Sequence, residues 1–155
     1  MKRITTVLAL ASAILGMSVA LAAASSAHSA ASVAVVGTRH TSLGTILVGT
    51  NGHTLYLYSS DPKNKSTCTG GCAAAWPRLT SSGKPKAKGA AKASDLGTIK
   101  VGKVAQVTYK GHALYYFASD TAAGQTTGQG ENGFYAVSPS GSAITKKPAS
   151  GSSGY

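Results

Sequence analysis

The chain carries two cysteines, Cys68 and Cys72, in the stretch STCTGGCAAAWP. An even cysteine count favours a disulfide in an exported protein, and the N-terminal residues of this chain indicate export. The glycines between the two cysteines, Gly70 and Gly71, allow the tight turn that so short a bridge requires. Two other interpretations stay open, because reduced thiolates could bind copper and the pair could act as a redox-active dithiol. We expect a structural disulfide.

Two histidines stand at matching places. His53 and His112 each follow a glycine, and each precedes a tyrosine by three residues, Tyr56 in one case and Tyr115 in the other. Histidine and tyrosine are both haem ligands, and histidine also binds copper. One hypothesis is therefore a haem- or copper-binding protein in which these four side chains meet near a pseudo-two-fold axis. The other interpretation is a pair of solvated histidines beside turns, with no cofactor.

Acidic residues are scarce, and the whole chain has four: Asp61, Asp95, Asp120 and Glu131. The sequence holds no nucleophile elbow, zinc-protease helix motif or phosphate-binding glycine loop, and the carboxylate spacing does not indicate a glycosidase pair. We therefore expect no catalytic residue. Asp61 and Asp120 each end a predicted strand, where a carboxylate commonly accepts backbone N–H groups in an Asx turn. Calcium would need more oxygen ligands than this chain offers.

Ten residues of the chain are written nearly twice, as GHTLYLYSSD at 52–61 and GHALYYFASD at 111–120. The same offset of 59 residues also pairs Tyr58 with Phe117, Thr67 with Thr126, Gly71 with Gly130, and Trp76 with Tyr135. Upstream, LGTILV at 43–48 matches LGTIKV at 96–101 with an offset of 53. The pattern predicts two tandem repeats, at 42–79 and 95–138, joined by a lysine-rich loop at 80–94.

Local signals in both repeats are those of strands and turns. Asn51-Gly52 lies between two apolar runs and predicts a β-hairpin, and Lys110-Gly111 gives a weaker signal at the same place. GFYAVSPSGSAIT, from Gly133, predicts a strand, a Pro-Ser-Gly turn and a return strand. CAAAW, from Cys72, suggests one turn of helix. We expect an all-β fold, a small sandwich-like domain built from two pseudo-symmetric repeats.

Strand periodicity assigns side chains to faces. His53, Leu55 and Leu57 share one face of the first predicted strand, and Tyr56 and Tyr58 share the other. The second repeat places His112, Leu114 and Tyr116 opposite Tyr115 and Phe117. Because both faces are apolar, we expect these strands to be buried and the aromatic side chains to form core. The other interpretation is a ligand platform, to which Trp76 would also contribute as a possible ligand residue.

The N-terminal 30 residues resemble a secretory signal peptide. Lys2 and Arg3 precede an apolar run from Val7 to Ala24, and small residues follow it, which predicts cleavage between Ala24 and Ala30. No cysteine lies there, so we expect a protein that is not lipidated and has no transmembrane span after cleavage. The mature part would be one β-rich domain at 31–145, with a disordered tail at 146–155.

Basic residues outnumber acidic ones, with 15 lysines and arginines against the four acids. Such a charge favours an anionic cell-envelope polymer as partner, and a protein partner is the alternative. The densest run, GKPKAKGAAK at 83–92, is read as a solvated flexible loop rather than a polyanion site. It contains no aromatic residues, so no specific nucleic acid is expected.

The residues YLYSSD and YYFASD both fit the pattern Tyr-x-[Phe/Trp/Tyr]-x-x-Asp. With the Cys-Trp block, the chain from Leu43 to Ile144 resembles the bacterial secreted-repeat proteins and predicted lipoproteins of unknown function. The resemblance implies export, envelope association and a tandem repeat, but no activity. It makes six residues family-defining positions without assigning them chemistry: Tyr56, Tyr58, Asp61, Tyr115, Phe117 and Asp120. We expect an exported, non-catalytic envelope protein, with a binding or structural role.

Overall fold

The computed structural model describes residues 32–147. The expected signal peptide at 1–30 lies outside the described residues. Of the tail expected at 146–155, residues 146 and 147 are described, and Lys146 O accepts a hydrogen bond from Gln129 Nε2 at 3.1 Å. Most regular structure is strand, as expected: β1 (Val35–Thr41), β2 (Gly44–Val48), β3 (Tyr56–Tyr58), β4 (Lys86–Ala87), β5 (Leu96–Val101), β6 (Val104–Tyr109), β7 (His112–Ala113) and β8 (Phe134–Ala136). The stretch CAAAW supplies the short helix α1 (Gly71–Ala75), and two 3-10 turns were not expected: Ala93–Asp95 and Glu131–Gly133.

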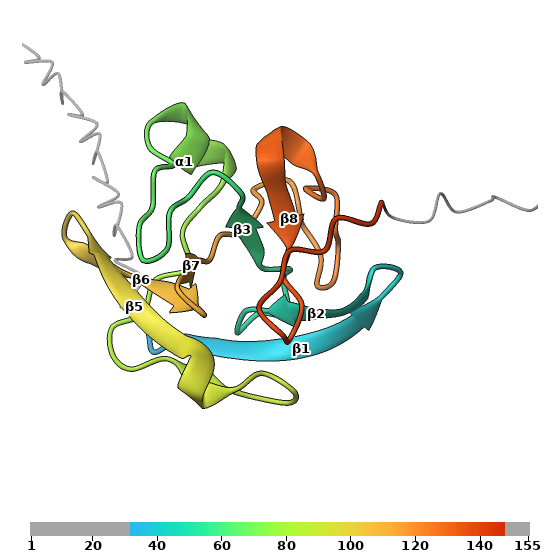
Figure 1. Ribbon diagram of the computed structural model, residues 1–155, viewed down its shortest axis with the longest axis horizontal. Helices are drawn as coiled ribbons and strands as arrows, with labels where there is room; N and C mark the ends of the chain where they lie inside the picture. The colour runs from blue at the N-terminus through green and yellow to red at the C-terminus, as the bar shows by residue number, and fades with distance from the viewer. Residues whose placement is uncertain (1–31, 148–155) are drawn as a thin grey trace, which may run out of the picture.

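The strands form three small sheets, with the orders β2-β1-β4, β3-β8 and β5-β6-β7. In Figure 1 the long strands β1 and β5 run along the lower part of the molecule, and α1 lies at the opposite end. In the same view β3 lies between α1 and β1, β8 stands beside α1, and the two strands of the sheet β3-β8 come from different repeats. The fold is therefore a small all-β domain whose centre is shared by both halves of the chain.

Each repeat begins with the same hairpin. β1 pairs antiparallel with β2, placing Gly37 opposite Val48, and β5 pairs with β6, placing Gly97 opposite Thr108. Gly97 thus takes the place of Gly37, 60 residues earlier. The match between LGTILV and LGTIKV at an offset of 53 is therefore wrong, because LGTIKV is β5, which corresponds to β1 and not to β2. The first repeat accordingly starts with β1, before residue 42.

The two predicted hairpin turns differ from expectation. Lys110 and Gly111, the weaker signal, have φ angles of 48° and 78° and join β6 directly to β7, with Tyr109 opposite His112. At Asn51-Gly52 only Gly52 has a positive φ, of 78°, and the wider loop is closed where Gly49 N donates to His53 O at 2.9 Å. Both turns reverse the chain, but the tight two-residue turn belongs to the second repeat.

The end of each repeat inserts into the other repeat. Val137 of the second repeat accepts a hydrogen bond from Leu47 N at 2.7 Å and donates to Leu55 O at 3.1 Å, both in the first repeat. The equivalent bonds join the end of the first repeat to the second, through Leu79 O with Val107 N and Leu79 N with Leu114 O. The two repeats are therefore interlocked, because each completes the hydrogen bonding of the other.

Two buried clusters fill the interior, one on each side of the central strands. An aliphatic cluster includes Leu55, Leu57 and Leu114, and an aromatic cluster includes Tyr56 and Tyr115. Tyr116 packs against the first, whereas Tyr58 and Phe117 pack against the second. The predicted alternation of faces is confirmed for these residues. Their burial on both sides also shows why the sequence there is apolar at successive positions.

The lysine-rich segment is not the flexible loop that was expected. β4 pairs in parallel with β1, and Lys88 N donates to Val36 O at 2.9 Å. Further along, Ala90 N donates to Thr38 Oγ1 at 3.2 Å, and Lys92 N donates to the hydroxyl of Tyr109 at 3.0 Å. Pro85 and Ala91 are buried. Backbone hydrogen bonds thus hold this segment along the outer side of β1, as its yellow-green course in Figure 1 shows.

Candidate functional site

The two motif tyrosines meet at the centre of the molecule. Tyr56 N donates to Tyr115 O at 2.8 Å, and Tyr115 N donates to Tyr56 O at 2.9 Å. This reciprocal antiparallel bridge joins equivalent residues of the two repeats. A pseudo-two-fold axis therefore passes between the two tyrosines, and each motif lies beside the other.

The aspartate of each motif binds the tyrosine of the other. Tyr56 donates its hydroxyl to Asp120 Oδ2 at 2.6 Å, and Tyr115 donates to Asp61 Oδ2 at 2.5 Å. Both tyrosines have no exposed surface, and the aspartates are 8% and 4% exposed for Asp61 and Asp120. Hydrogen bonds between an ionised and a neutral group are about twice as strong as neutral ones, and removing one partner leaves a buried group unsatisfied. The motif therefore specifies a Tyr–Asp hydrogen bond between the repeats, and this bond occurs twice.

The second oxygen of each aspartate fixes the loop that follows. Asp61 Oδ1 accepts from Thr67 N at 2.8 Å and from Thr67 Oγ1 at 2.6 Å. Asp120 Oδ1 accepts from Thr127 N at 3.0 Å and from the Thr127 hydroxyl. The aspartates do accept backbone N–H groups, as expected, but six and seven residues downstream rather than in the expected Asx turn. Thr127, and not Thr126, is thus the counterpart of Thr67.

The environment of the pair keeps both phenols protonated. Burial, followed by the hydrogen bond to Asp61, raises the pKa of Tyr115 to about 12, and Ser66 Oγ lies 2.7 Å from its hydroxyl. Burial, followed by the hydrogen bond to Asp120, also raises the pKa of Tyr56. Each phenol is therefore a hydrogen-bond donor to a carboxylate across the neutral pH range, which suits a structural lock.

Four aromatic rings stack through the centre. Trp76 and Phe134 lie face to face, with centroids 3.8 Å apart and planes 5° apart. Tyr58 stacks on the outer side of Phe134 at 4.4 Å, and Phe117 lies on the outer side of Trp76 at 4.5 Å with a tilt of 32°. Trp76 is 2% exposed and Phe134 is 1% exposed. The aromatic residues thus form core, and Trp76 does not present a ligand platform.

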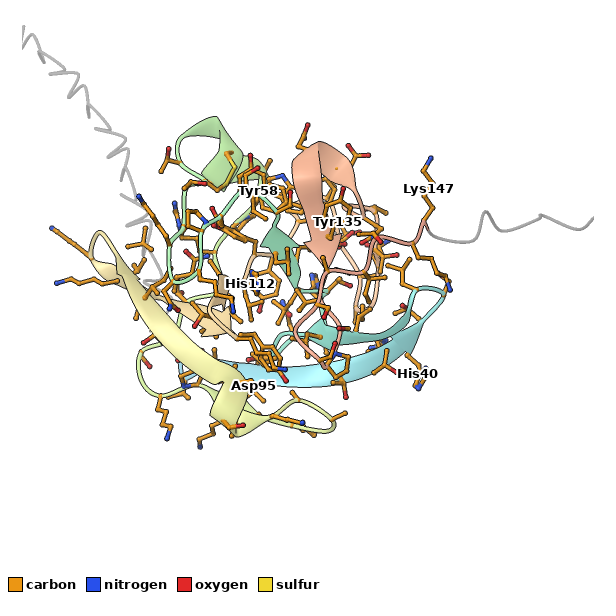
Figure 2. All side chains as sticks on the ribbon, in the orientation of Figure 1. His40, Tyr58, Asp95, His112, Tyr135 and Lys147 are labelled. Atoms are coloured by element: carbon orange, nitrogen blue, oxygen red, sulfur yellow. A yellow bond between two sulfur atoms is a disulfide. The ribbon has the colours of Figure 1, made fainter. Side chains whose placement is uncertain are left out.

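The ring that corresponds to Trp76 is Phe134 rather than Tyr135. Ala118 N donates to Ala75 O, and at the symmetric place Ser59 N donates to Gly133 O, both at 2.9 Å. The residues after these two carbonyls are Trp76 and Phe134. Tyr135 lies on the other face of β8 and is partly exposed, as Figure 2 shows at the upper part of the molecule. Sequence alignment missed Phe134 because the repeats differ in loop length before it.

The histidines do not lie near the axis. His53 and His112 each precede the bridged tyrosines by three residues on antiparallel segments, so they extend toward opposite ends, about 20 Å apart along the strand direction. Burial, followed by the charge of Lys63, lowers the pKa of His112. Within residues 32–147, no three His, Cys, Asp or Glu side chains gather in a group that could hold a metal ion. The four proposed haem ligands therefore do not converge.

The cysteines form the expected disulfide. Cys68 and Cys72 are bonded, with Cα atoms 5.3 Å apart, at the start of α1. Cys68 is 1% exposed and belongs to the aromatic cluster, and the guanidinium of Arg78 donates to its carbonyl. A disulfide sulfur is not a thiolate, so this bridge offers copper no thiolate ligand. Its position links the loop after Asp61 to the helix that presents Trp76.

Comparison with known proteins places these repeats in a family. The profile of a family described as a secreted repeat of unknown function matches the chain at residues 37–80 and 98–137. No curated protein and no solved structure matches the chain. In the part of the chain that the structure describes, no helix is long and apolar enough to cross a membrane. The two matches cover more than half of the chain and coincide with the two interlocked repeats, so the chain belongs to this family of secreted repeats of unknown function.

Proposed function

We propose that the chain is an exported, non-catalytic module of the bacterial cell envelope that binds an anionic envelope polymer through its basic surface. The proposal is carried by where the charges lie. Asp61 and Asp120 are buried at the axis, and Asp95 contacts Lys110 at 3.8 Å. Glu131 is the one acid among the described residues that is fully exposed. The acidic residues therefore offset little of the positive charge at the surface.

The basic residues in the described part of the chain are all accessible. Of the 15 lysines and arginines in the chain, all except Lys2 and Arg3 lie within the described residues, and none of those 13 is buried. A surface with this balance attracts polyanions, and each phosphate contact releases counterions. Binding of this kind weakens steeply as salt is added, which gives the proposal a direct signature.

The absence of catalysis belongs to the same proposal. The buried ionisable groups that hydrogen bonds join in the described residues are the two Tyr–Asp pairs. None of these four side chains lines any of the main surface depressions of the described residues. A protonated, buried phenol whose carboxylate partner is also satisfied is a poor candidate for proton transfer to a substrate.

Calorimetric titration with purified poly(glycerol phosphate), at 50 and 200 mM salt, tests the function. We expect binding at the lower salt that falls by roughly tenfold or more at the higher salt, and no binding to neutral dextran. No binding to the polyanion at low salt would defeat the proposal. Binding that ignores salt, or that dextran reproduces, would equally defeat it and would favour a protein or neutral partner.

The proposal also includes no cofactor. We expect no Soret or charge-transfer band when haem or copper is added to the purified protein, because the ligands proposed from sequence do not converge. A band that disappears in the variant H53A/H112A would contradict this part of the proposal. The double variant is a suitable probe because both histidines lie outside the buried core.

A further inference from the structure

We propose that β4 and its neighbours form a binding strip for a linear phosphodiester polymer of the poly(glycerol phosphate) type. The strip consists of Lys84, Lys86 and Lys88, and we call it the lysine strip. This inference rests on the proposed function and assigns it a site. It also makes a narrower claim, because it attributes polymer binding to three particular side chains rather than to net charge.

The backbone places two of the three lysines, Lys86 and Lys88, on one face of the segment. Lys86 N donates to Ala34 O and Lys88 N donates to Val36 O, both at 2.9 Å, so the segment runs extended beside β1. Between the lysines, Pro85 is buried and Ala87 packs against the aliphatic cluster. Since side chains of an extended segment alternate, the exposed Lys86 and Lys88 share the outer face with about 7 Å between them, and the exposed Lys84 lies in the bend just before β4. Successive phosphates of an extended polyol phosphodiester are separated by a comparable length.

The positive charges of the lysine strip are not neutralised by acidic side chains. β4 is an edge strand in the order β2-β1-β4, so one side of it is open to solvent. The only ion pair within residues 32–147 joins Lys110 to Asp95, which leaves all three lysines unpaired. No acidic residue occurs between Asp61 and Asp95 in the chain. An anion that approaches this edge therefore meets no carboxylate from the segment that contains β4.

Shallow depressions lie at both ends of the strip. One, of about 440 Å³, is lined by Lys84 together with Ser81, Ser82 and Thr98. The other, of about 300 Å³, is lined by Lys88 together with Thr38 and Thr50. The exposed side chains of Ser82 and Thr98 in the first depression can bond polyol hydroxyls, while the ammonium groups bind the phosphates. The strip thus has a depression at each end and ammonium groups between them, which suits a linear polymer.

Two other polyanions fit this surface less well. Single-stranded nucleic acids bind through aromatic side chains that stack with the bases, and neither depression has an aromatic lining residue. Anionic membranes are bound more firmly when apolar side chains enter the interface. Among the described residues the large exposed apolar side chains are two single valines, Val33 and Val104. The phosphodiester polymer is therefore the ligand that the surface favours.

The test compares two triple variants of equal charge. K84Q/K86Q/K88Q removes the strip, and K63Q/K65Q/K146Q removes three exposed lysines from other segments. Lys86 and Lys88 bond β1 through their backbone, so glutamine retains the pairing of β4 with β1. A third variant, K84R/K86R/K88R, keeps the charge. Each is titrated with poly(glycerol phosphate) at several salt concentrations, and thermal unfolding checks that all three are folded.

We expect the strip variant to lose about tenfold or more in affinity and to reduce the slope of log K against log salt by about 2, while the control variant and the arginine variant stay near wild type. Equal losses in the strip and control variants would overturn the lysine strip and leave the proposed function standing as a diffuse charge effect. If the wild-type protein does not bind the polymer at all, both the lysine strip and the proposed function are wrong. Tighter binding to phosphatidylglycerol vesicles or to oligo-dT, with the same lysine dependence, would overturn the choice of ligand.

Discussion

Around the pseudo-two-fold axis, the Tyr–Asp hydrogen bonds, the tyrosine bridge and the ring stack of one repeat have counterparts in the other, whereas at the periphery the repeats differ. Tyr56 meets the edge of Trp76 at 5.3 Å, and Tyr115 meets the edge of Phe134 at the same distance. Away from the axis, the first repeat has a disulfide that the second lacks. The shared motif therefore specifies how the repeats interlock, while residues away from the axis differ between the repeats. The lysine strip lies in the segment that joins the two repeats.

One difference between the repeats is compensated across the interface. Gly49 of the first repeat takes the place of Tyr109 in the second, and a Cβ at Gly49 would lie 2.0 Å from the hydroxyl of Tyr116. At the symmetric place, the smaller Leu57 corresponds to Tyr116 and lies in the same cluster as Tyr109. A large side chain on one repeat thus faces a small one on the other in both halves, which preserves packing density.

The largest expected effect comes from the stacked rings at the axis. Trp76→Ala and Phe134→Ala should each lower the free energy of unfolding by about 3–5 kcal/mol, because each leaves a cavity in a fully buried stack. Urea denaturation gives the measurement, and Trp76→Phe, which keeps a ring, serves as control with a smaller loss. If only one of the two alanine variants is destabilised, the equivalence of Trp76 and Phe134 fails.

The crossed hydrogen bonds should come next. Tyr56→Phe and Tyr115→Phe each leave a buried carboxylate oxygen without its donor, so each should cost about 1.5–3 kcal/mol of unfolding free energy. An exposed comparison is Tyr135→Phe, which should change the unfolding free energy by less than about 0.5 kcal/mol. Unequal losses at Tyr56 and Tyr115 would show that the two locks are not energetically equivalent.

The contact between Gly49 and Tyr116 allows a rescue experiment. Gly49→Ala should destabilise the protein by about 1–3 kcal/mol because the new methyl group meets the Tyr116 hydroxyl. Adding Tyr116→Leu, which copies the residue at the symmetric place, should restore part of that loss. Thermal melts of the two single variants and the double variant measure the coupling. Additive losses, without rescue, would contradict the proposed contact across the interface.

The pH dependence of stability should be the smallest effect under ordinary conditions. The pKa of Tyr115 is about 12 in the folded protein and about 10 in an unfolded chain. Its contribution is therefore complete below pH 10 and is lost as the pH rises from 10 to 12, because the unfolded chain releases the proton first. Chemical denaturation at pH 9 and at pH 11.5 should show this fall, and Tyr115→Phe should reduce it. An unchanged fall in that variant would remove Tyr115 as its source.

Much of the local structure could be predicted from sequence. Period-two alternation predicts Leu55 and Tyr56 on opposite faces, and the even cysteine count of an exported chain predicts the bridge between Cys68 and Cys72. Alternation assigns a face to each side chain, but it cannot say which distant strand will pair. The exchange of Val137 and Leu79 between repeats, and with it the Tyr–Asp crossing, therefore came only from the structure.

Two sequence matches failed for identifiable reasons. LGTILV and LGTIKV agree because short runs that contain β-branched residues suit many strands, whereas the register of each hairpin is set by its turn and by what it buries. Trp76 was aligned with Tyr135 because the offset between repeats was held constant, although the loops after Asp61 and Asp120 differ in length. In the lysine-rich segment, exposed lysines hid the buried Pro85 and Ala91, which hold it to β1.

The interlocking of the repeats is tested most directly by separating them. Residues 32–83 and 84–147 would be made as two chains and examined alone and mixed, by circular dichroism, amide dispersion in NMR spectra and sedimentation. We predict that neither fragment folds as a monomer, because each lacks the strand and the aspartate that the other supplies, and that mixing yields a folded one-to-one complex. A fragment that is folded and monomeric by itself would contradict the account.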